Sequence, residues 1–340
     1  MDADAHEIIR ELRPHRVLEV VDEPSRLRAF IVLDSVVLGP AAGGVRTRRY
    51  ASQREAVEDA CRLARAMTLK CSLAGLDAGG AKAVVLDHPE LDRAAAFEEI
   101  GRRVEALRGQ FRTAGDYGTT DEDLAAMSRH TRYVHTDTGN LSGAVARGVL
   151  CCLQAAVDRK GRPGLSELTA AVQGCGDIGG AVARALVEAG AVVRVADLVP
   201  ARAEAVAAEV GATVVDPKRL LFEDVDLLVP CAGSGVLTTA VASEVRAWVV
   251  CGGANRITVD DSVDRVLFDR GILHVPDLLS SAGAVIEGVG RTVMGLDDRR
   301  PLIDALGNTA RLILEDAERE GTPPVEHARR RARARIDAAS

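Results

Sequence analysis

Aromatic residues are scarce in this sequence of 340 residues, at only 3% of the chain. The core must therefore be packed from Ala, Val, Leu and Ile, which is typical of helices laid on a buried parallel sheet. Hydrophobic residues make up 47% and charged residues 27%, a balance that excludes the disordered and fibrous classes of protein. The length exceeds a usual allowance of roughly 100–200 residues per domain and predicts two domains.

Long apolar runs, a secretory start and paired cysteines are also missing. No stretch approaches about 18 uninterrupted apolar residues, and the first residues lack a basic and then apolar pattern, so we expect neither a membrane span nor a signal peptide. The seven cysteines contain no CxxC spacing, and an odd number of them fits thiols that stay reduced. We therefore expect a cytoplasmic protein that holds no metal.

An excess of positive charge is lacking as well, because the net charge is −7. The field of the whole molecule would slightly repel nucleic acid and anionic lipid, so we expect neither as a partner, and local cations must hold any anionic ligand. The basic run at 329–335 is the exception. We interpret it as the solvated end of a helix, because it continues a polar, Ala-rich helical pattern; the alternative is a patch that binds nucleic acid.

Residues 1–140 carry a mixed α/β pattern. Alternating or continuous apolar residues predict strands, and apolar residues at helical spacing predict helices. The strands are expected at 16–21, 27–38, 83–86 and 110–114, and the helices at 54–67, at 92–107 and after the capping segment 119–123.

From about Ser142 onward the pattern changes to short apolar strands that alternate with helices, as in a parallel sheet buried on both faces. The strands are expected at 169–173, 192–196, 226–229, 247–251 and 272–275, and the helices at 144–159 and 181–189. This pattern predicts a doubly wound domain of the Rossmann type over 141–302. The helical stretch at about 303–340 is expected to pack back on the first domain.

Three glycines, Gly174, Gly176 and Gly179, lie in GxGxxG spacing between an expected strand and a helix that begins near Ile178. In that context the first glycine permits a tight turn, the second lets the backbone approach a pyrophosphate, and the third lets helix and strand pack closely. The helix N-terminus would face the phosphates, so Asp177 and Ile178 complete the expected dinucleotide site. The alternative is that the glycines only shape the turn.

An acidic residue follows the glycine turn at the spacing that a dinucleotide site requires. Asp197 ends the next expected strand, 18 residues after Gly179, where its carboxylate would accept hydrogen bonds from the adenosine ribose. A 2′-phosphate would meet a like charge there, so we expect NAD rather than NADP as the cofactor. The alternative is a solvated aspartate at the end of a strand.

Two lysines lie in an Ala- and Gly-rich, apolar setting, where lysines are rare unless they have partners. Lys70 and Lys82 are 12 residues apart, and Gly79 and Gly80 beside Lys82 would let a ligand or another backbone come close. A partly dry pocket, and a second cation nearby, would lower the pKa of an ammonium toward that of a useful base. The alternative is that each lysine reaches solvent from the end of an element.

Asp116 follows the expected strand at 110–114 and precedes a capped helix. Its position suits a carboxylate that transfers protons, and it suits a helix-capping or turn aspartate equally well. The residues alone leave both interpretations open.

Six blocks of sequence carry a family resemblance. In chain order they are LGPAAGGVR at 38–46, MTLK at 67–70, GGAK at 79–82, TAGDYGT at 113–119, PCA at 230–232 and GGAN at 252–255. From about residue 17 to residue 295 the chain resembles the glutamate/leucine/phenylalanine/valine dehydrogenases, and most of all their short leucine/valine/phenylalanine branch. The resemblance implies a first domain that binds substrate and forms a homo-oligomer, and a second domain that binds NAD.

The resemblance also implies a role for each matching residue of the first domain. Gly43, Gly44 and Lys70 would hold the α-carboxylate of the substrate. Lys82 would be the general base, and Asp116 would shuttle protons to and from the amine. The implied reaction is the reversible, NAD-dependent oxidative deamination of an L-α-amino acid with an uncharged side chain, which passes through an iminium and yields a 2-oxo acid and ammonia.

Further implied contacts lie in the second half of the chain. Cys231 and Ala232 would contact the cofactor, and Asn255 would contact the nicotinamide ribose or the substrate. Ser281 stands where relatives commonly have an asparagine, and it would lie near the substrate.

Two further positions depart from the family pattern and bear on the ligands. Val145 stands where the family usually has a threonine that bonds the nicotinamide amide, so Ser142 or Thr138 must substitute or the ring is held differently. Ala42 replaces a bulkier residue before the two glycines. With Ser281, these changes imply an altered substrate pocket. One methylene group more or less on a substrate changes the free energy of discrimination by such a pocket by only about 1–3 kcal/mol.

Two other functions fit the same scaffold. One is an imine reductase or cyclising dehydrogenase of a biosynthetic pathway, and the other is a non-catalytic NAD-binding regulator. The presence of Lys70, Lys82 and Asp116 together argues against the regulator, because buried charges are costly to keep without a use.

Overall fold

A computed structural model describes residues 3–136 and 139–340 of the chain. The chain divides into two compact units, which we describe one at a time. The first unit comprises Met1–Gly139, Gly288–Asp297 and Arg333–Ser340, and the second comprises Asn140–Glu287 and Asp298–Ala332.

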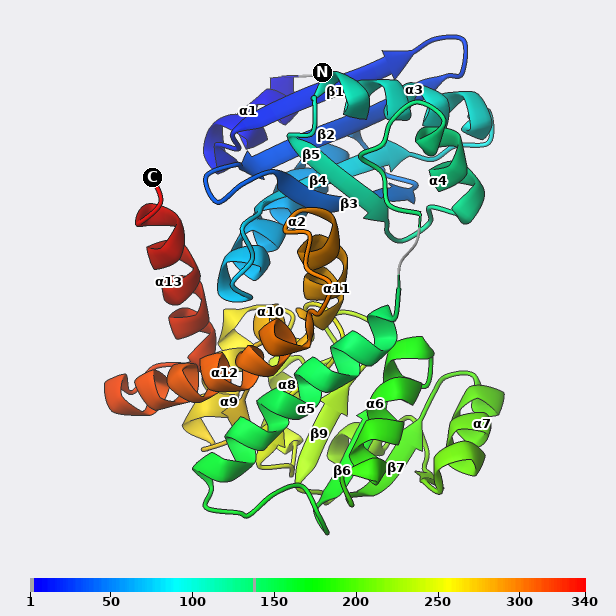
Figure 1. Cartoon of the computed structure of the whole chain (residues 1–340). Coiled ribbons are helices and arrows are strands. Elements are labelled where there is room, and N and C mark those ends of the chain that lie inside the picture. The colour runs from blue at the N-terminus through cyan, green and yellow to red at the C-terminus, as the bar shows by residue number, and fades with distance from the viewer. Residues whose placement is uncertain (1–2, 137–138) are drawn as a thin grey trace. The chain divides into compact units, whose positions relative to one another are not determined.

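The first unit is built on a five-stranded mixed sheet (Figure 1). Its strands are β1 (Arg16–Asp22), β2 (Leu27–Ser35), β3 (Ala41–Arg48), β4 (Gly79–Leu86) and β5 (Phe111–Gly115), in the spatial order β1-β2-β4-β3-β5. β1 and β4 each pair antiparallel with β2, whereas β3 pairs parallel with both β4 and β5. The parallel part, β4-β3-β5, therefore brings three strands of distant sequence side by side.

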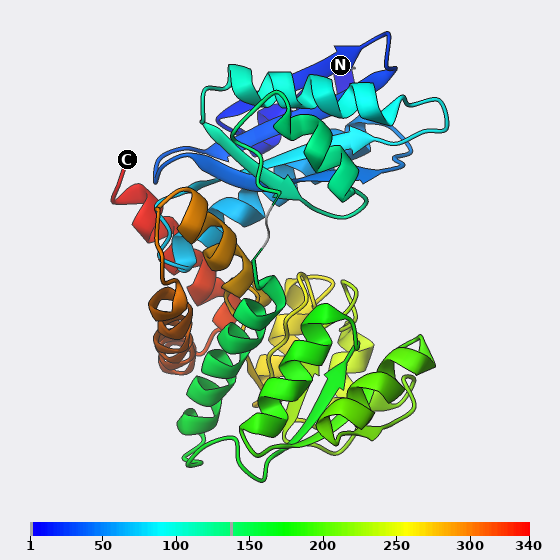
Figure 2. The ribbon, with the colours of Figure 1, turned by 45° about the vertical axis from the view of Figure 1, so that its right-hand side comes forward.

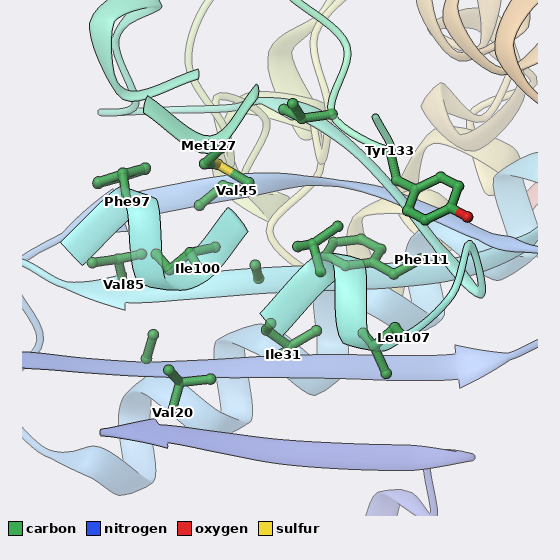
Figure 3. Close-up of a cluster of buried hydrophobic side chains, with 14 of the residues drawn as sticks. Val20, Ile31, Val45, Val85, Phe97, Ile100, Leu107, Phe111, Met127 and Tyr133 are labelled. Atoms are coloured by element: carbon green, nitrogen blue, oxygen red, sulfur yellow. The ribbon is translucent and has the colours of Figure 1, made fainter. Parts of the chain in front are cut away.

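Helices cover both faces of this sheet. Apolar residues of α1 (Ala3–Leu12) and α2 (Gln53–Leu73) pack with Phe30, Val32 and Val84 on one face. Those of α3 (Arg93–Ala106) and α4 (Asp121–Ser128) form the core of the other face, where Phe97, Ile100 and Met127 meet Val45 and Val85 (Figure 3). As the composition predicts, most of this core is aliphatic.

The second unit is built on a six-stranded sheet in which every pair of neighbours runs parallel. Its strands are β6 (Thr169–Gln173), β7 (Val192–Ala196), β8 (Thr213–Val214), β9 (Leu227–Pro230), β10 (Val249–Val250) and β11 (Leu273–His274), in the order β11-β10-β9-β6-β7-β8. Counted from β6, this is the order 6-5-4-1-2-3 of a doubly wound dinucleotide-binding fold. The predicted fold class is confirmed.

The helices of the second unit lie before its first strand, between its strands and after them. They are α5 (Leu141–Arg159), α6 (Asp177–Glu188), α7 (Pro200–Val210), the 3-10 helix η1 (Leu220–Phe222), α8 (Thr239–Glu244), α9 (Asp261–Asp269), α10 (Asp277–Ser280) and α12 (Arg300–Glu320). Two more, α11 (Gly283–Thr292) and α13 (Pro324–Asp337), begin in this unit and end in segments grouped with the first.

One helix of the second unit, α5, is long and apolar enough by composition to cross a membrane, but 56% of its most apolar window is buried. It lies beside α6 in both views (Figure 1 and Figure 2) and contacts α12 as well, as the core helix of a globular unit does.

A partly buried carboxylate joins the N-terminal ends of strands in the second unit. The carboxylate of Asp226 accepts hydrogen bonds from the backbone N–H and the hydroxyl of Thr169, both at 2.8 Å. It also accepts one from the indole Nε1–H of Trp248 at 2.8 Å. The single tryptophan of the chain is therefore fixed at the end of the sheet where the strands begin.

The structure differs from the expected bounds at several places, and the following differences concern the site and the domains. β3 was not expected, and β4 begins at Gly79, before the expected strand at 83–86. The stretch 303–340 was expected to join the first domain, but only Arg333–Ser340 is grouped there. The reason is that α12 packs along α5, where Leu306 contacts Gly148 and Arg147 pairs with Asp304.

Candidate active site

Lys82 lies within β4, where only 6% of the residue is exposed. Its Nζ is 2.6 Å from Oδ2 of Asp116, which directly follows β5. Strand β3 separates β4 from β5, and its Gly44 leaves room for the pair. A Cβ at Gly44 would lie 2.9 Å from the Cβ of Asp116 and 2.8 Å from the carbonyl oxygen of Gly115. The lysine of β4 and the aspartate after β5 thus meet across a position of β3 that only glycine can occupy.

A second cation holds the same carboxylate. The Nε–H of Arg46, on β3, donates to Oδ2 of Asp116 at 2.9 Å. The other end of the guanidinium lies 3.3 Å from Oδ2 of Asp59 on α2, which also accepts the hydroxyl of Tyr50 at 2.8 Å. Asp116 therefore lies between two positive charges, and Arg46 lies between two negative ones.

The charges of this cluster set its protonation. Burial alone would raise the pKa of Asp116, but the charges of Lys82 and Arg46 outweigh it and lower the pKa to about 2. Burial lowers the pKa of Lys82 below its usual value, Asp116 opposes that shift, and Arg46 adds to it. The result is an ionised carboxylate beside a lysine whose charged form is disfavoured.

Gly43 and Lys70, expected to hold a carboxylate, lie on β3 and near the end of α2. A Cβ at Gly43 would come within 1.7 Å of the carbonyl oxygen of Ala81, so β3 and β4 approach each other closely there. Lys70 is 7% exposed. Two residues before it, the backbone nitrogen of Thr68 lies against Gly80 of β4, where a Cβ would come within 2.0 Å. The glycines thus let α2 bring its buried lysine close to β4.

Lysine is a rare residue in this chain, with four lysines among 43 basic residues. Two of the four, Lys70 and Lys82, are buried. A buried lysine is costly because its ammonium loses water. Since almost all the other basic residues of the chain are arginines, the two buried lysines mark positions where the compact ammonium of lysine is used in place of a guanidinium.

In the second unit, the glycine turn has the geometry that a dinucleotide requires. Gly174 has φ +93°, which suits glycine alone, and a Cβ there would lie 2.3 Å from the Cβ of Ala232. A Cβ at Gly179 would come within 1.9 Å of the carbonyl oxygen of Gly174, so α6 packs closely on the turn. Around Gly176, by contrast, a Cβ would meet no atom within 4 Å among the described residues. The middle glycine therefore faces open space, where a phosphate can approach.

A cavity of about 650 Å³ opens at this turn and at the N-terminus of α6. Its lining includes Ser142, Gly176 and Asp177, together with Arg202 and with Arg184, which is paired with Glu209 of the same lining. A helix N-terminus and nearby cations favour an anionic group, and the volume is in the range of a cofactor site. The residues present fit the pyrophosphate of a dinucleotide.

Asp197 follows β7 and joins the turn to the start of α7. One carboxylate oxygen accepts the backbone N–H of Cys175 and the other accepts that of Val199, both at 2.8 Å. Burial works against the charge of Asp197, but these two hydrogen bonds outweigh it and lower the pKa of the carboxyl. The carboxylate is thus held ionised at the carboxyl edge of the parallel sheet, as a ribose-binding acid must be.

Cys231 and Ala232 lie directly after β9 and beside the turn. The backbone N–H of Cys231 donates to the carbonyl oxygen of Gln173 at 2.7 Å, which continues the β6–β9 pairing. The thiol of Cys231 is buried, and burial raises its pKa to about 12, so it is a packing group and no nucleophile.

Val145, on α5, is buried against the same region. A Cβ at Gly253 would lie 2.8 Å from Ile178 and 3.2 Å from Val145, so the glycine allows α5 and α6 to approach the loop after β10. Of the two residues considered as substitutes for the missing threonine, Ser142 lines the cavity at the glycine turn. Thr138 lies outside the described residues.

Asn255 and Ser281 lie together in the second unit. The Ser281 hydroxyl lies 3.1 Å from Oδ1 of Asn255 and donates to the backbone carbonyl oxygen of Asp277 at 2.6 Å. Ser281 is 4% exposed, whereas Asn255 is exposed. The buried serine is thus a direct neighbour of the exposed asparagine in the loop that follows β10.

The predicted site residues thus form two groups. One, in the first unit, joins Lys82, Asp116 and Gly44, with Gly43 and Lys70 beside them. The other, in the second unit, joins the glycine turn with Asp197, Cys231 and Ala232, and holds the Asn255–Ser281 pair. Within residues 3–136 and 139–340, no group of His, Cys, Asp and Glu side chains is placed to hold a metal ion.

Sequence analysis missed Arg46 as a site residue, together with Asp59 and Tyr50. Arg46 belongs to the block at 38–46, but one arginine among many carries no signal of its own. Arg46 is two residues from Gly44, so the two residues lie on the same face of a strand. The sequence did not predict a strand there, and this signal was therefore not available.

Comparison with known proteins finds relatives along most of the chain. Residues 15–133 match the family model described as Glu/Leu/Phe/Val dehydrogenase, dimerisation domain, and residues 195–289 match that of Glutamate/Leucine/Phenylalanine/Valine dehydrogenase. A leucine dehydrogenase of Thermoactinomyces intermedius is 34% identical over 93% of this chain and 89% of its own length. An L-tryptophan dehydrogenase of Nostoc punctiforme is 32% identical over 97% of this chain and 96% of its own.

A solved structure extends the likeness to three dimensions. The crystal structure of L-tryptophan dehydrogenase from Nostoc punctiforme superposes with a TM-score of 0.88 at 32% identity, and the match covers 98% of each chain. The likeness therefore includes both units.

Proposed function

We infer what this chain does from one premise: it belongs to the Glu/Leu/Phe/Val dehydrogenase family. We propose that it catalyses the reversible, NAD-dependent oxidative deamination of an L-α-amino acid with an uncharged side chain to the 2-oxo acid and ammonia. The observation that carries the proposal is the ion pair of Lys82 and Asp116, buried at the lysine end and 2.6 Å long. Relatives that act on leucine and tryptophan support the uncharged side chain.

Lys82 is the proposed general base. In its neutral form the amine can take a proton from a water molecule, which then attacks the iminium carbon left when hydride departs from Cα. A bound nicotinamide would accept that hydride. The burial that lowers the pKa of Lys82 makes its neutral form more accessible than that of an exposed lysine.

Asp116 is the proposed proton shuttle. Because its carboxyl is ionised, it can accept a hydrogen bond from the substrate amine while it remains paired with Lys82. A proton can then pass between the amine and the lysine through the carboxylate. Ammonia leaves once the amine carries the extra proton.

The substrate carboxylate is assigned to Lys70, with Gly43 and Gly44 leaving room for it. Lys70 is 7% exposed, and its positive charge is opposite to that of the α-carboxylate that every substrate of this class carries. Asn255 and Ser281 are proposed to contact the substrate or the nicotinamide ribose.

NAD is the proposed cofactor, bound by the second unit. Gly174, Gly176 and Gly179 would hold the pyrophosphate with Asp177 and Ile178 at the helix N-terminus, and Cys231 and Ala232 would flank it. The ionised carboxylate of Asp197 supports NAD over NADP, because a 2′-phosphate would meet its negative charge.

A homo-oligomer in the cytoplasm is the proposed state of the protein. The match of residues 15–133 to a dimerisation domain supports the oligomer, and light scattering measures it directly. The seven cysteines are all free thiols, as in a reducing compartment.

The test is the appearance of NADH at alkaline pH over a panel of L-amino acids, with Lys82→Ala as the variant. We expect turnover with one or more apolar or aromatic amino acids, and a loss of kcat of about 10²–10⁴-fold in Lys82→Ala. Lys218→Ala, at an exposed loop position, is the matched control and should keep the wild-type rate.

No NADH with any amino acid, or equal rates in wild type and Lys82→Ala, would refute the proposal. Reduction of a cyclic imine by NADH without ammonia would indicate the cyclising reaction instead.

A further inference from the structure

Arg46 has no role in the reaction proposed above, yet it touches the central carboxylate. We propose that Arg46 is a positioning residue, which fixes the carboxylate of Asp116 against Lys82 and presses the lysine toward its neutral form by charge repulsion. This inference rests on the proposed function, because it concerns the same lysine and aspartate.

The first argument is geometric. One oxygen, Oδ2 of Asp116, accepts both Nζ of Lys82 at 2.6 Å and Nε of Arg46 at 2.9 Å. Arg46 is itself held at its far end, because its Nη1 lies 3.3 Å from Oδ2 of Asp59. Asp59 in turn accepts the hydroxyl of Tyr50 at 2.8 Å. Both partners of Arg46 therefore restrain it, and it can restrain Asp116.

The second argument concerns what happens when Lys82 gives up its proton. With Lys82 as its sole partner, Asp116 would become a poorly solvated, unpaired anion, and that cost would make the lysine retain its proton. A guanidinium stays charged at any working pH, so Arg46 keeps Asp116 paired in both states of Lys82. The lysine can then cycle between its charged and neutral forms without leaving the carboxylate alone.

The charges around Lys82 must be considered together. Among the charged groups on the elements packed against β4 are Arg46 on β3, Asp116 after β5, Asp59 and Lys70 on α2, and Asp34 on β2, which pairs with Arg65 of α2. Arg46 lowers the pKa of Lys82, whereas Asp116 and Asp59 raise it. Removing Arg46 and neutralising Asp59 should therefore shift the titration of Lys82 in opposite directions.

The experiment is the pH dependence of kcat/KM for amino-acid oxidation in the full-length protein. The rate should rise with pH as Lys82 becomes neutral. In Arg46→Gln, the loss of a nearby cation should move this rising limb by about one to two pH units toward alkaline pH. Arg46→Lys, which retains a charge, should bring the limb most of the way back. Asp59→Asn should move it toward acid pH by a smaller amount.

The matched control is Arg48→Gln. Arg48 lies two residues further along β3 and pairs with Glu55 of α2 at 3.0 Å, away from Asp116. Its removal should leave the rising limb at the wild-type pH.

A limb that stays in place in Arg46→Gln, whether the rate falls or not, would overturn the inference and reduce Arg46 to a structural role. If Arg46→Gln does not fold, Asp59→Asn decides, and a limb that stays or moves toward alkaline pH overturns the inference. Wild-type turnover separates the two proposals. An inactive wild type refutes the proposed function and this inference with it, whereas an active wild type with an unmoved limb refutes the inference alone.

Discussion

Asp197 illustrates how one side chain can serve both the fold and the cofactor. Its two oxygens accept backbone N–H groups from Cys175, within the glycine turn, and from Val199, at the start of α7. The same carboxylate is proposed to bind the ribose. Its two hydrogen bonds therefore join the turn to the start of α7, and its proposed contact with the ribose would add a selection between NAD and NADP.

This double role predicts the effect of Asp197→Asn. An amide keeps one acceptor, brings a donor against the second N–H and removes the negative charge, so we expect the KM for NAD to rise about 10–100-fold. The ratio of NADP to NAD use should rise as well, because the repulsion is gone and Arg202 lines the adjacent cavity. Steady-state kinetics with both cofactors measure this, and Asp269→Asn, at an exposed position of α9, is the control. An unchanged KM for NAD would place the ribose elsewhere.

At the scale of the element, β3 is the strand on which the active site depends. Its first four residues are Ala41, Ala42, Gly43 and Gly44, which have little strand propensity of their own. They form a strand because β4 and β5 lie on both sides and because the glycines permit closer approach than other residues would. The tertiary context decides the conformation here, and the local sequence does not.

Gly43→Ala tests this close approach. The added Cβ would lie 1.7 Å from a backbone oxygen of β4, so the strands must separate, and we expect the free energy of unfolding to fall by about 3 kcal/mol or more. Urea unfolding measures the change. The control is Gly288→Ala on α11, where the Cβ meets nothing within 4 Å among the described residues and a helix gains at most about 1 kcal/mol. Equal stability of the two variants would contradict the tight contact.

Much of the fold was predictable from the sequence, and the reasons are local. β6 and β7 have the predicted bounds because short apolar runs between turns are typical of buried parallel strands. The glycine turn was predictable because its spacing is fixed by chain geometry. β3 and Arg46 were not, because both depend on residues 13 to 70 positions away, and no alternation of apolar residues marks them.

At the scale of the whole molecule, the basic C-terminal run is accounted for by contacts within the chain. Arg329 pairs with Asp261, Arg330 with Glu320, and Arg331 with Asp316. Arg335 reaches the C-terminal end of α2, where it donates to the carbonyl oxygen of Leu76 at 2.7 Å and pairs with Asp77 at 2.8 Å. The last helix, α13, is thus a partner of the helix that carries Lys70.

Removing that contact should loosen the end of α2. For Arg335→Ala we expect the free energy of unfolding to fall by about 1 kcal/mol, since the arginine is partly exposed, and the KM for the amino acid to rise several-fold. Hydrogen exchange at Ala74 and Leu76, together with kinetics, measures both effects. Arg333→Ala is the control, because Arg333 is exposed and has no ion pair or hydrogen bond in the described part of the chain. The same KM in both variants would show that Lys70 does not depend on the C-terminus.

The scarcity of aromatic residues, together with the fixed place of Trp248, provides two separate optical reporters. The only tryptophan is bonded to Asp226 in the second unit, whereas all three tyrosines, Tyr50, Tyr117 and Tyr133, lie in the first. Fluorescence excited selectively at the indole therefore follows the melting of the cofactor-binding unit alone. Tyrosine absorbance follows the catalytic unit, so a single sample reveals whether the two units unfold together or in sequence, without any label.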